Sequence, residues 1–257
     1  PFVDIKQPNI SLVTDNEIEE TIALKVTDYS VSFDDILLEN VNFEVKSNDK
    51  VALIGPNGTG KTTLLREIFK NNHPSFEINK DIDMAYLSQL QGEMLNESHT
   101  ILEEFFDAGF KTSQEIKSYI SNYGGEKNIL QLAKVSASKA NMLLLDEPTS
   151  HLDTYSQMAL ERAIEDYKGA ILMISHDYYF IVNCMDFVLI IEDKTIRKIS
   201  MRKFRKMIYA SHFDKDYLEI EQKKKSVETK IELALQNSNF ELAKVLSEQL
   251  EELINLL

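Results

Sequence analysis

The chain of 257 residues is poor in several residue types, and each shortage narrows its class. Its one cysteine, Cys184, cannot form an internal disulfide, which agrees with a reducing compartment. No apolar run approaches the roughly 18 residues that a membrane helix needs, and no basic-then-apolar leader opens the sequence. We therefore expect a cytoplasmic protein without direct membrane insertion.

Basic residues are also in deficit. The 28 lysines and arginines face 42 aspartates and glutamates, which leaves a net charge of −14. This charge argues against nucleic-acid binding by the chain as a whole, because phosphate backbones attract basic surfaces. The one local patch that could meet RNA is the basic run 197–206, and a solvated face is the alternative interpretation.

Apolar patterning predicts alternating strands and helices within an α/β fold. Residues 1–21 are expected to be an entering linker, and the β-rich runs between Ala23 and Phe43 predict short antiparallel strands. The continuous apolar runs 51–54, 142–145 and 170–174 are typical of strands buried in a parallel sheet. Helices are predicted at 61–71, 98–122, 126–140 and 155–168.

The composition changes beyond residue 213 to Glu, Lys, Leu and Gln, without glycine or proline. Apolar residues at helical spacing lie on both sides of Asn237-Ser238-Asn239, which suits a turn and an N-cap. We therefore expect a C-terminal helical hairpin over 213–257, with apolar stripes too short for a coiled coil.

Glycine is scarce, and five of the eight glycines are Gly55, Gly58, Gly60, Gly124 and Gly125. The first three belong to a G-x-x-x-x-G-K-[ST] motif placed between a predicted strand and a predicted helix. Such a loop lets main-chain amides curl around phosphates at a helix N-terminus. The residues predicted to bind nucleotide here are Gly55, Pro56, Asn57, Gly58, Thr59, Gly60, Lys61, Thr62 and Thr63.

Within this motif, Lys61 is expected to reach the β- and γ-phosphates and Thr62 to offer its hydroxyl to Mg²⁺. Two carboxylates, Asp146 and Glu147, follow the apolar strand 142–145 and should lie at the same sheet edge. Asp146 is suited to hold the Mg²⁺ shell, and Glu147 to polarise an attacking water. A polar strand end without chemistry is the alternative for this pair.

Taken together, these ordered motifs resemble the nucleotide-binding domain of ATP-binding cassette (ABC) proteins over about residues 22–212. The resemblance implies a mainly parallel P-loop sheet core, an antiparallel β subdomain, a shortened helical subdomain and a helical tail. It also implies an ATPase that uses ATP and Mg²⁺ and works with a second cassette.

The family's roles transfer to several further residues by position. Phe33 occupies the place of the aromatic that stacks on adenine, with core packing as its alternative. Gln89 resembles the glutamine that bridges Mg²⁺ and the attacking water. His176 resembles the switch histidine that contacts the γ-phosphate. The segment Ser150–Asp153 resembles the D-loop, which meets the opposing cassette.

One motif departs from the family pattern. Where the family has Leu-Ser-Gly-Gly-Glu, this chain has Asn122-Tyr123-Gly124-Gly125-Glu126, only 35 positions after Gln89. Either this signature is degenerate, or residues between about Tyr123 and Gly124 are missing from the given sequence. In both cases Gly124 and Gly125 are predicted to contact nucleotide held by a partner cassette.

Within the superfamily, Glu147-Pro-Thr-Ser-His-Leu-Asp153 most resembles the ABC-F group, which acts on the ribosome. The linker 1–21 and the tail 213–257 suggest the second cassette of such a protein, and the resemblance implies a translation factor or an antibiotic-resistance protein. The alternatives are the ATPase subunit of a membrane transporter and a nucleotide-gated scaffold that barely hydrolyses ATP.

Overall fold

The structure is a computed structural model that describes residues 10–14, 19–33, 35–88, 105, 110–121, 127–150, 152–212, 227, 230, 242, 245 and 246. The chain divides into two compact units, Pro1–Met201 and Arg202–Leu257. The sequence-based boundary was placed later, after residue 212. Each unit is described by itself below.

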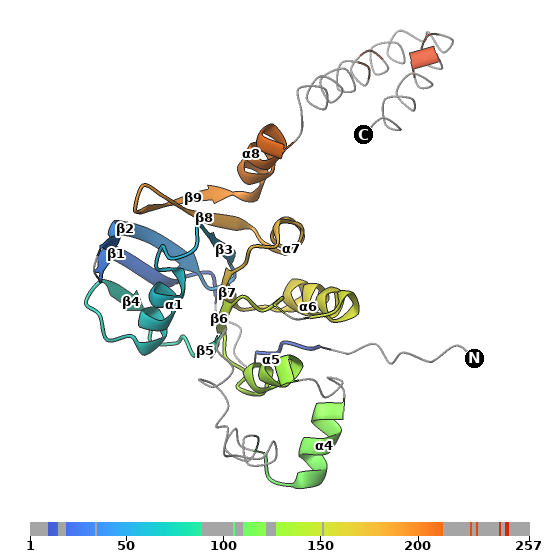
Figure 1. The fold of residues 1–257 in the computed structure, drawn as a ribbon. Coiled ribbons are helices and arrows are strands. Elements are labelled where there is room, and N and C mark those ends of the chain that lie inside the picture. The colour runs from blue at the N-terminus through green and yellow to red at the C-terminus, as the bar shows by residue number, and fades with distance from the viewer. Residues whose placement is uncertain are drawn as a thin grey trace. The chain divides into compact units, whose positions relative to one another are not determined.

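A six-stranded sheet forms the centre of the first unit (Figure 1). Its order is β5 (Met84–Leu87), β6 (Met142–Asp146), β7 (Ala170–Ile174), β3 (Lys50–Ile54), β8 (Phe187–Glu192) and β9 (Thr195–Ser200). Neighbouring strands run parallel except β8 and β9, which pair antiparallel. The predicted mainly parallel sheet is therefore confirmed.

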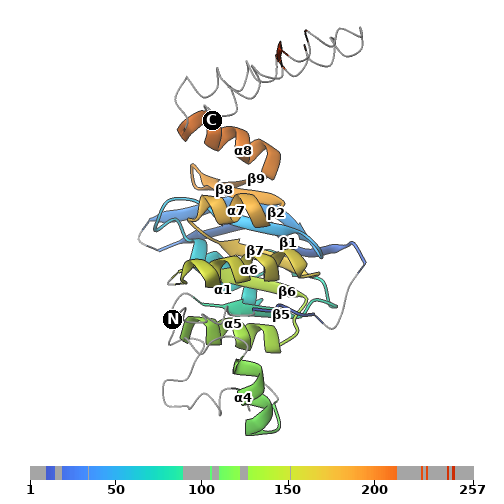
Figure 2. The same cartoon turned by 90° about the vertical axis from the view of Figure 1, so that its right-hand side faces the viewer.

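Continuous apolar runs serve this sheet because both of its faces are buried. Met142 and Leu144 of β6 join the main core, whereas Leu143 and Leu145 are buried outside it, as the two-residue period of a strand requires. The main core also takes in Leu64 and Leu65 of helix α1 (Lys61–Lys70). The other face is covered by helices α5 (Lys127–Ala137), α6 (Thr154–Asp166) and α7 (Tyr178–Cys184) (Figure 2). Each fully buried leucine contributes about 1.5–3 kcal/mol.

A second sheet is antiparallel, with order β2 (Ile36–Lys46), β1 (Ile22–Ser32) and β4 (Phe76–Ile78). The expected antiparallel subdomain is present, but the prediction of short strands was wrong, since β1 and β2 each have 11 residues. Register shifts interrupt their pairing, and Asp28 and Asn40 take left-handed φ of 51° and 50°. These bulges break the alternation that would have revealed long strands.

The helices are α1 (Lys61–Lys70), α4 (Ser113–Ser121), α5 (Lys127–Ala137), α6 (Thr154–Asp166), α7 (Tyr178–Cys184) and α8 (Met201–His212). Helices α1, α5 and α6 coincide with predicted helical stretches. The prediction of one helix over 98–122 was wrong in extent, since residues 110–112 are not helical and α4 begins only at Ser113. Cys184 is buried at the end of α7, and burial raises the pKa of its thiol to about 12, so the thiol stays protonated. Cys184 therefore packs as a small buried hydrophobic residue.

The hairpin of β8 and β9 was not foreseen. Its two turn residues, Asp193 and Lys194, both have positive φ of 48° and 64°. Two-residue turns of this kind usually carry Asn-Gly or Asp-Gly, and lysine in the second place hides the signal.

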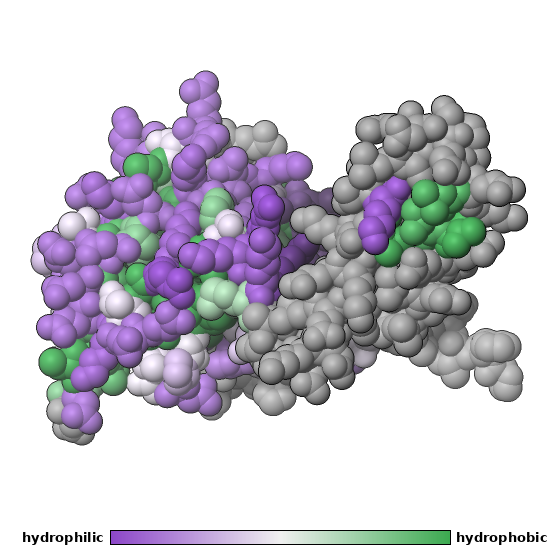
Figure 3. All heavy atoms as spheres, turned by 90° about the horizontal axis from the view of Figure 1, so that it is seen from above, coloured by the Kyte–Doolittle hydropathy of each residue, from purple (hydrophilic) through white to green (hydrophobic). Residues whose placement is uncertain are grey.

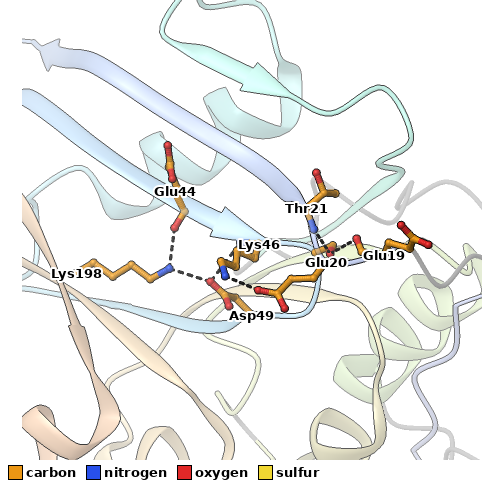
Figure 4. A network of polar contacts seen from close by, with 8 residues as sticks. Glu19, Glu20, Thr21, Glu44, Lys46, Asp49 and Lys198 are labelled. Carbon is orange, nitrogen blue, oxygen red and sulfur yellow. Dashed lines mark hydrogen bonds and ion pairs between the residues drawn. The ribbon is translucent and has the colours of Figure 1, made fainter.

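Part of the predicted linker packs on the first unit. Ile10 and Leu12 are buried, and the Ser136 hydroxyl of α5 donates a hydrogen bond to the Ser11 carbonyl. Farther along, the Ser47 hydroxyl donates to the Glu19 carbonyl at 3.1 Å, and Lys46 forms an ion pair with Glu20 (Figure 4). The segment before β1 is thus attached at two places.

The second unit opens with α8, whose first turns bury Phe204 and expose four basic side chains, Arg202, Lys203, Arg205 and Lys206. The described residues of the tail are Val227, Lys230, Leu242, Val245 and Leu246, all helical. Val227 and Leu246 are buried. In the space-filling view a hydrophobic patch lies next to a hydrophilic one (Figure 3). None of the described helices is both long and apolar enough to cross a membrane.

Candidate active site

A cavity of about 670 Å³ opens where strands β3, β6 and β7 end at the N-terminus of α1. Parallel α/β sheets place ligand sites at this carboxyl edge. The cavity is lined by Leu37, Asn57, Gly58, Gly60, Lys61, Thr62, Thr63, Asp146, Glu147, Ser150, Ile174 and His176.

The loop from β3 to α1 depends on its glycines. Gly58 and Gly60 have φ of 79° and 88°, in the left-handed region that side chains with a Cβ rarely adopt. A Cβ on Gly55 would lie 2.8 Å from the Ile191 Cβ, so this glycine permits close strand packing. Thr59 closes the loop by donating its hydroxyl to the Pro56 carbonyl at 2.9 Å. The loop shape therefore requires these residue types.

Helix α1 begins directly after Gly60, and no described side chain caps its N-terminus. The first amides of the helix therefore have no side-chain acceptor among the described residues, and the helix dipole adds partial positive charge at the cavity. A helix end of this kind favours an anion such as phosphate. Lys61, Thr62 and Thr63 all lie on this first turn.

Lys61 is 7% exposed, and its ammonium donates to the carbonyls of Gly55 and Pro56, both at 2.8 Å. Burial lowers the pKa of Lys61, while the charges of Glu147 and Asp146 oppose that change. The carbonyls hold the cation inside the loop, where it faces two carboxylates. Such a cation is well placed to compensate phosphate charge.

Asp146 ends β6 and is only 1% exposed. Burial raises the pKa of this carboxyl, whereas hydrogen bonding to Thr62 and the charge of Arg66 favour its ionised form. Its Oδ1 atom has no hydrogen-bond partner among the described residues. A buried, unpartnered carboxylate oxygen beside a threonine hydroxyl is a donor set that suits Mg²⁺. These two residues therefore fit the implied metal.

Glu147 follows with φ of 52°, a left-handed conformation that is unfavourable for glutamate. Its amide donates to the Ile174 carbonyl at 3.0 Å, which ties this residue to the end of β7. Its Oε1 lies 3.2 Å from His176 Nε2, and the two side chains are 11% and 54% exposed. Burial raises the pKa of Glu147, and the charge of His176 lowers it in part.

Phe33 lies in the turn between β1 and β2 and is 72% exposed, so it is not a core residue. It does not line the described cavity, and its adenine contact stays a prediction. Sequence reasoning missed Leu37, which lines the cavity and would lie 3.5 Å from a Cβ on Gly60. Its alternation within β2, one residue before buried Leu38, was the available signal.

Some predicted residues lie outside the part of the chain that the structure describes. These are Gln89, His151, Gly124 and Gly125. Their predicted roles therefore remain predictions. Asp153 of the same D-loop segment is described, and it caps α6 by accepting a hydrogen bond from the Ser156 amide at 2.7 Å.

Comparison with known proteins finds similar chains among ATP-binding cassette proteins. The family model described as ABC transporter matches residues 38–108. YdiF of Bacillus subtilis is 36% identical over 207 residues, covering 70% of this chain and 31% of that protein. ABC transporter F family member 5 of Arabidopsis thaliana is 34% identical, covering 62% of this chain and 26% of that protein.

The ribosome protection protein VmlR of Bacillus subtilis is 32% identical, covering 63% of this chain and 32% of that protein. The chain thus spans about a quarter to a third of the length of these relatives. Among solved structures, the ATP-binding subunit of an ABC transporter has a TM-score of 0.60 at 22% identity, covering 78% of this chain and 99% of that one. This likeness supports the fold.

Proposed function

Since the chain carries an ABC-type ATP-binding domain similar to those of ABC-F proteins, we propose that it binds and hydrolyses Mg²⁺-ATP as one cassette of a ribosome-acting protein. The observation that carries the proposal is the convergence of Lys61, Asp146, Glu147 and His176 on one cavity at a helix N-terminus. Each of these residues supplies a different element of phosphoryl transfer.

Phosphate binding rests on the loop and the first turn of α1. The amides of this turn and the Lys61 ammonium provide positive charge close to the phosphates, in a site whose Lys61 and Asp146 side chains are buried. Thr62 and Asp146 would hold Mg²⁺. When bound, Mg²⁺ neutralises charge on the β- and γ-phosphates.

Hydrolysis rests on Glu147, which is the base proposed to orient and polarise the attacking water. Its partly buried carboxylate has the raised pKa that makes a better proton acceptor. His176 lies within hydrogen-bond reach of this carboxylate and is exposed enough to meet a γ-phosphate. The fixed backbone of Glu147 limits the directions that its carboxylate can take.

The proposed partners are a second cassette and the ribosome. A second cassette would supply a signature to nucleotide held by Lys61, while Gly124 and Gly125 of this chain would serve the partner's nucleotide. Support for the ribosome comes from the resemblance to VmlR, whose name describes ribosome protection, and from the exposed basic residues of α8. On a chain of net charge −14, such a patch is a local site for RNA phosphates.

Calorimetry with ATP tests the nucleotide site. Lys61→Ala should abolish measurable ATP binding, whereas Lys70→Ala, at the exposed end of the same helix, should leave binding unchanged. In the assembled, two-cassette protein, Glu147→Gln should keep ATP affinity and slow turnover in a phosphate-release assay about 100-fold or more, with Glu165→Gln on α6 as control. Unchanged ATP affinity in Lys61→Ala would remove the phosphate-loop assignment.

Co-sedimentation of the full-length Glu147→Gln protein with ribosomes in ATP tests the partner. We expect ATP-dependent binding that weakens when Arg202, Lys203, Arg205 and Lys206 are all changed to glutamine. The rival function, ATPase subunit of a membrane transporter, predicts no ribosome binding and association with a permease instead.

A further inference from the structure

Tyr86 contacts Asp146 of the proposed metal site, although none of the sequence-based site predictions includes this tyrosine. It belongs to β5, the edge strand of the six-stranded sheet, and pairs in register with Leu144 of β6. Both residues point to the side of the sheet that faces α1, where Tyr86 stacks on Phe69 with ring centroids 5.5 Å apart. This packing fixes the ring and so sets where its hydroxyl lies.

The Tyr86 hydroxyl donates a hydrogen bond to Asp146 Oδ2 over 3.5 Å. Arg66 of α1 and Ser88 also hydrogen bond to this tyrosine, and a guanidinium can only donate. The phenol oxygen therefore accepts from Arg66, while its own proton is donated to Asp146 Oδ2. Arg66, Tyr86 and Asp146 thus form a chain of directed hydrogen bonds from α1 through β5 to β6.

The two oxygens of Asp146 are not equivalent in this arrangement. Oδ2 has the Tyr86 hydroxyl, whereas Oδ1 has no partner among the described residues although the side chain is buried. A hydrogen bond to one carboxylate oxygen restricts rotation of the group and leaves the other oxygen for a metal or its water. Partners behind a metal ligand orient it in this way.

We propose that Tyr86 is a positioning residue for the Mg²⁺ site. Its hydroxyl holds Asp146 through Oδ2, so that Oδ1 is presented to the metal shell. This rests on the proposed function, since it assigns Asp146 to Mg²⁺-ATP. Tyr86 does not line the cavity described above. Its removal should therefore weaken metal-dependent binding and leave metal-free binding intact.

The test is Tyr86→Phe, which keeps the ring on Phe69 and deletes only the hydroxyl. ATP affinity is measured by calorimetry across a Mg²⁺ titration and in EDTA. The expected result is about a tenfold higher Mg²⁺ concentration for half-maximal tightening of ATP binding, with unchanged affinity in EDTA. The control is Tyr167→Phe, which loses a buried hydroxyl that donates to the Ala140 carbonyl at 2.7 Å.

Tyr167→Phe should leave the Mg²⁺ dependence unchanged. A wild-type Mg²⁺ dependence in Tyr86→Phe would overturn the inference, as would an equal loss of ATP binding with and without metal. If instead the wild-type chain bound no ATP at all, the proposed function itself would fail. The melting temperature of each variant, measured without ligand, shows that the comparison is between folded proteins.

Discussion

At the scale of single residues, Glu147 has a strained backbone, and the proposed role of its carboxylate in hydrolysis accounts for this strain. Its φ of 52° is a conformation that an L-residue with a Cβ pays about 1–2 kcal/mol to adopt. Two hydrogen bonds maintain it, from the Glu147 amide to Ile174 and from the Ser150 amide to the Glu147 carbonyl, at 3.0 and 3.1 Å. The carboxylate is thereby aimed by the main chain.

This strain predicts an inverted glycine effect. Glu147→Gly should be more stable than Glu147→Ala by about 1 kcal/mol, because glycine accepts positive φ. Its melting temperature should accordingly be higher by roughly 2–4 °C. At ordinary positions alanine is the more stable of the two. Scanning calorimetry of both variants decides, and an alanine variant that is equal or more stable would mean that no strain exists here.

Asp146 predicts a pH dependence. Burial raises the pKa of its carboxyl, so the folded chain binds this proton more tightly than the unfolded chain and loses stability as pH rises through the raised value. Asp146→Asn should therefore melt above wild type at about pH 8 in EDTA, and the difference should shrink at acid pH, where Asp146 is already neutral.

The same proton competes with the metal. Mg²⁺-dependent ATP binding of the wild type should weaken, as pH falls, at a pH above the range of a solvated aspartate. Isothermal titrations across pH measure this midpoint. A midpoint at the ordinary aspartate value would contradict the burial argument.

At the scale of elements, Lys198 links β9 to β2 of the antiparallel sheet and to the turn that follows β2. Lys198 Nζ donates to Asp49 Oδ2 and to the Glu44 carbonyl, both at 2.8 Å (Figure 4). It also lies 4.3 Å from the Phe187 ring centroid. The Asp49 side chain is 8% exposed, so removal of Lys198 would leave a nearly buried carboxylate without this partner.

Lys198→Met should therefore lower the free energy of unfolding by about 1.5–3 kcal/mol. Its neighbour Arg197 forms an exposed pair with Glu192 at 3.0 Å, and Arg197→Met should cost less than about 1 kcal/mol. Urea unfolding of both variants compares them. Equal losses would show that burial of the Asp49 pair has no special value.

The elements differ in how far the sequence determined them. Strands β3, β6 and β7 were predictable because both faces of the sheet are buried, which leaves uninterrupted apolar runs. The β8–β9 hairpin and the length of β1 and β2 were not, because Lys194 and the bulge residues Asp28 and Asn40 take left-handed conformations that no local pattern announces. Tyr86 was missed for a different reason, since its role comes from contacts with α1 and β6.

The candidate site was predictable where chemistry demands fixed residue types in fixed order. The phosphate loop, Asp146, Glu147 and His176 were found in the sequence. Most of the loop residues line one cavity together with these three side chains, whereas Gly55, Pro56 and Thr59 do not line it. Leu37 was missed because an apolar lining residue looks like any other strand residue. The burial state of Phe33 depended on the turn between two strands, which the sequence did not define.

At the scale of the whole molecule, we predict that the isolated chain binds ATP as a monomer and hydrolyses it slowly. In ABC proteins the signature of one cassette meets nucleotide on another, so one copy holds two halves of different sites. A net charge of −14 on each copy opposes self-association. Sedimentation with Mg²⁺-ATP and phosphate release at rising protein concentration test this, and a stable homodimer with fast turnover would refute it.

The exposed position of Phe33 also allows nucleotide binding to be followed by tryptophan fluorescence. The chain contains no tryptophan, so Phe33→Trp creates a single emitter on a background of tyrosine. Because position 33 is 72% exposed, that indole should emit at the long wavelengths of a hydrated ring. If this position stacks on adenine, ATP should quench or blue-shift the emission, and Lys61→Ala should abolish the change. If Phe33→Trp binds ATP without any change in emission, adenine stacking at this turn is excluded. The base must then bind elsewhere on the chain.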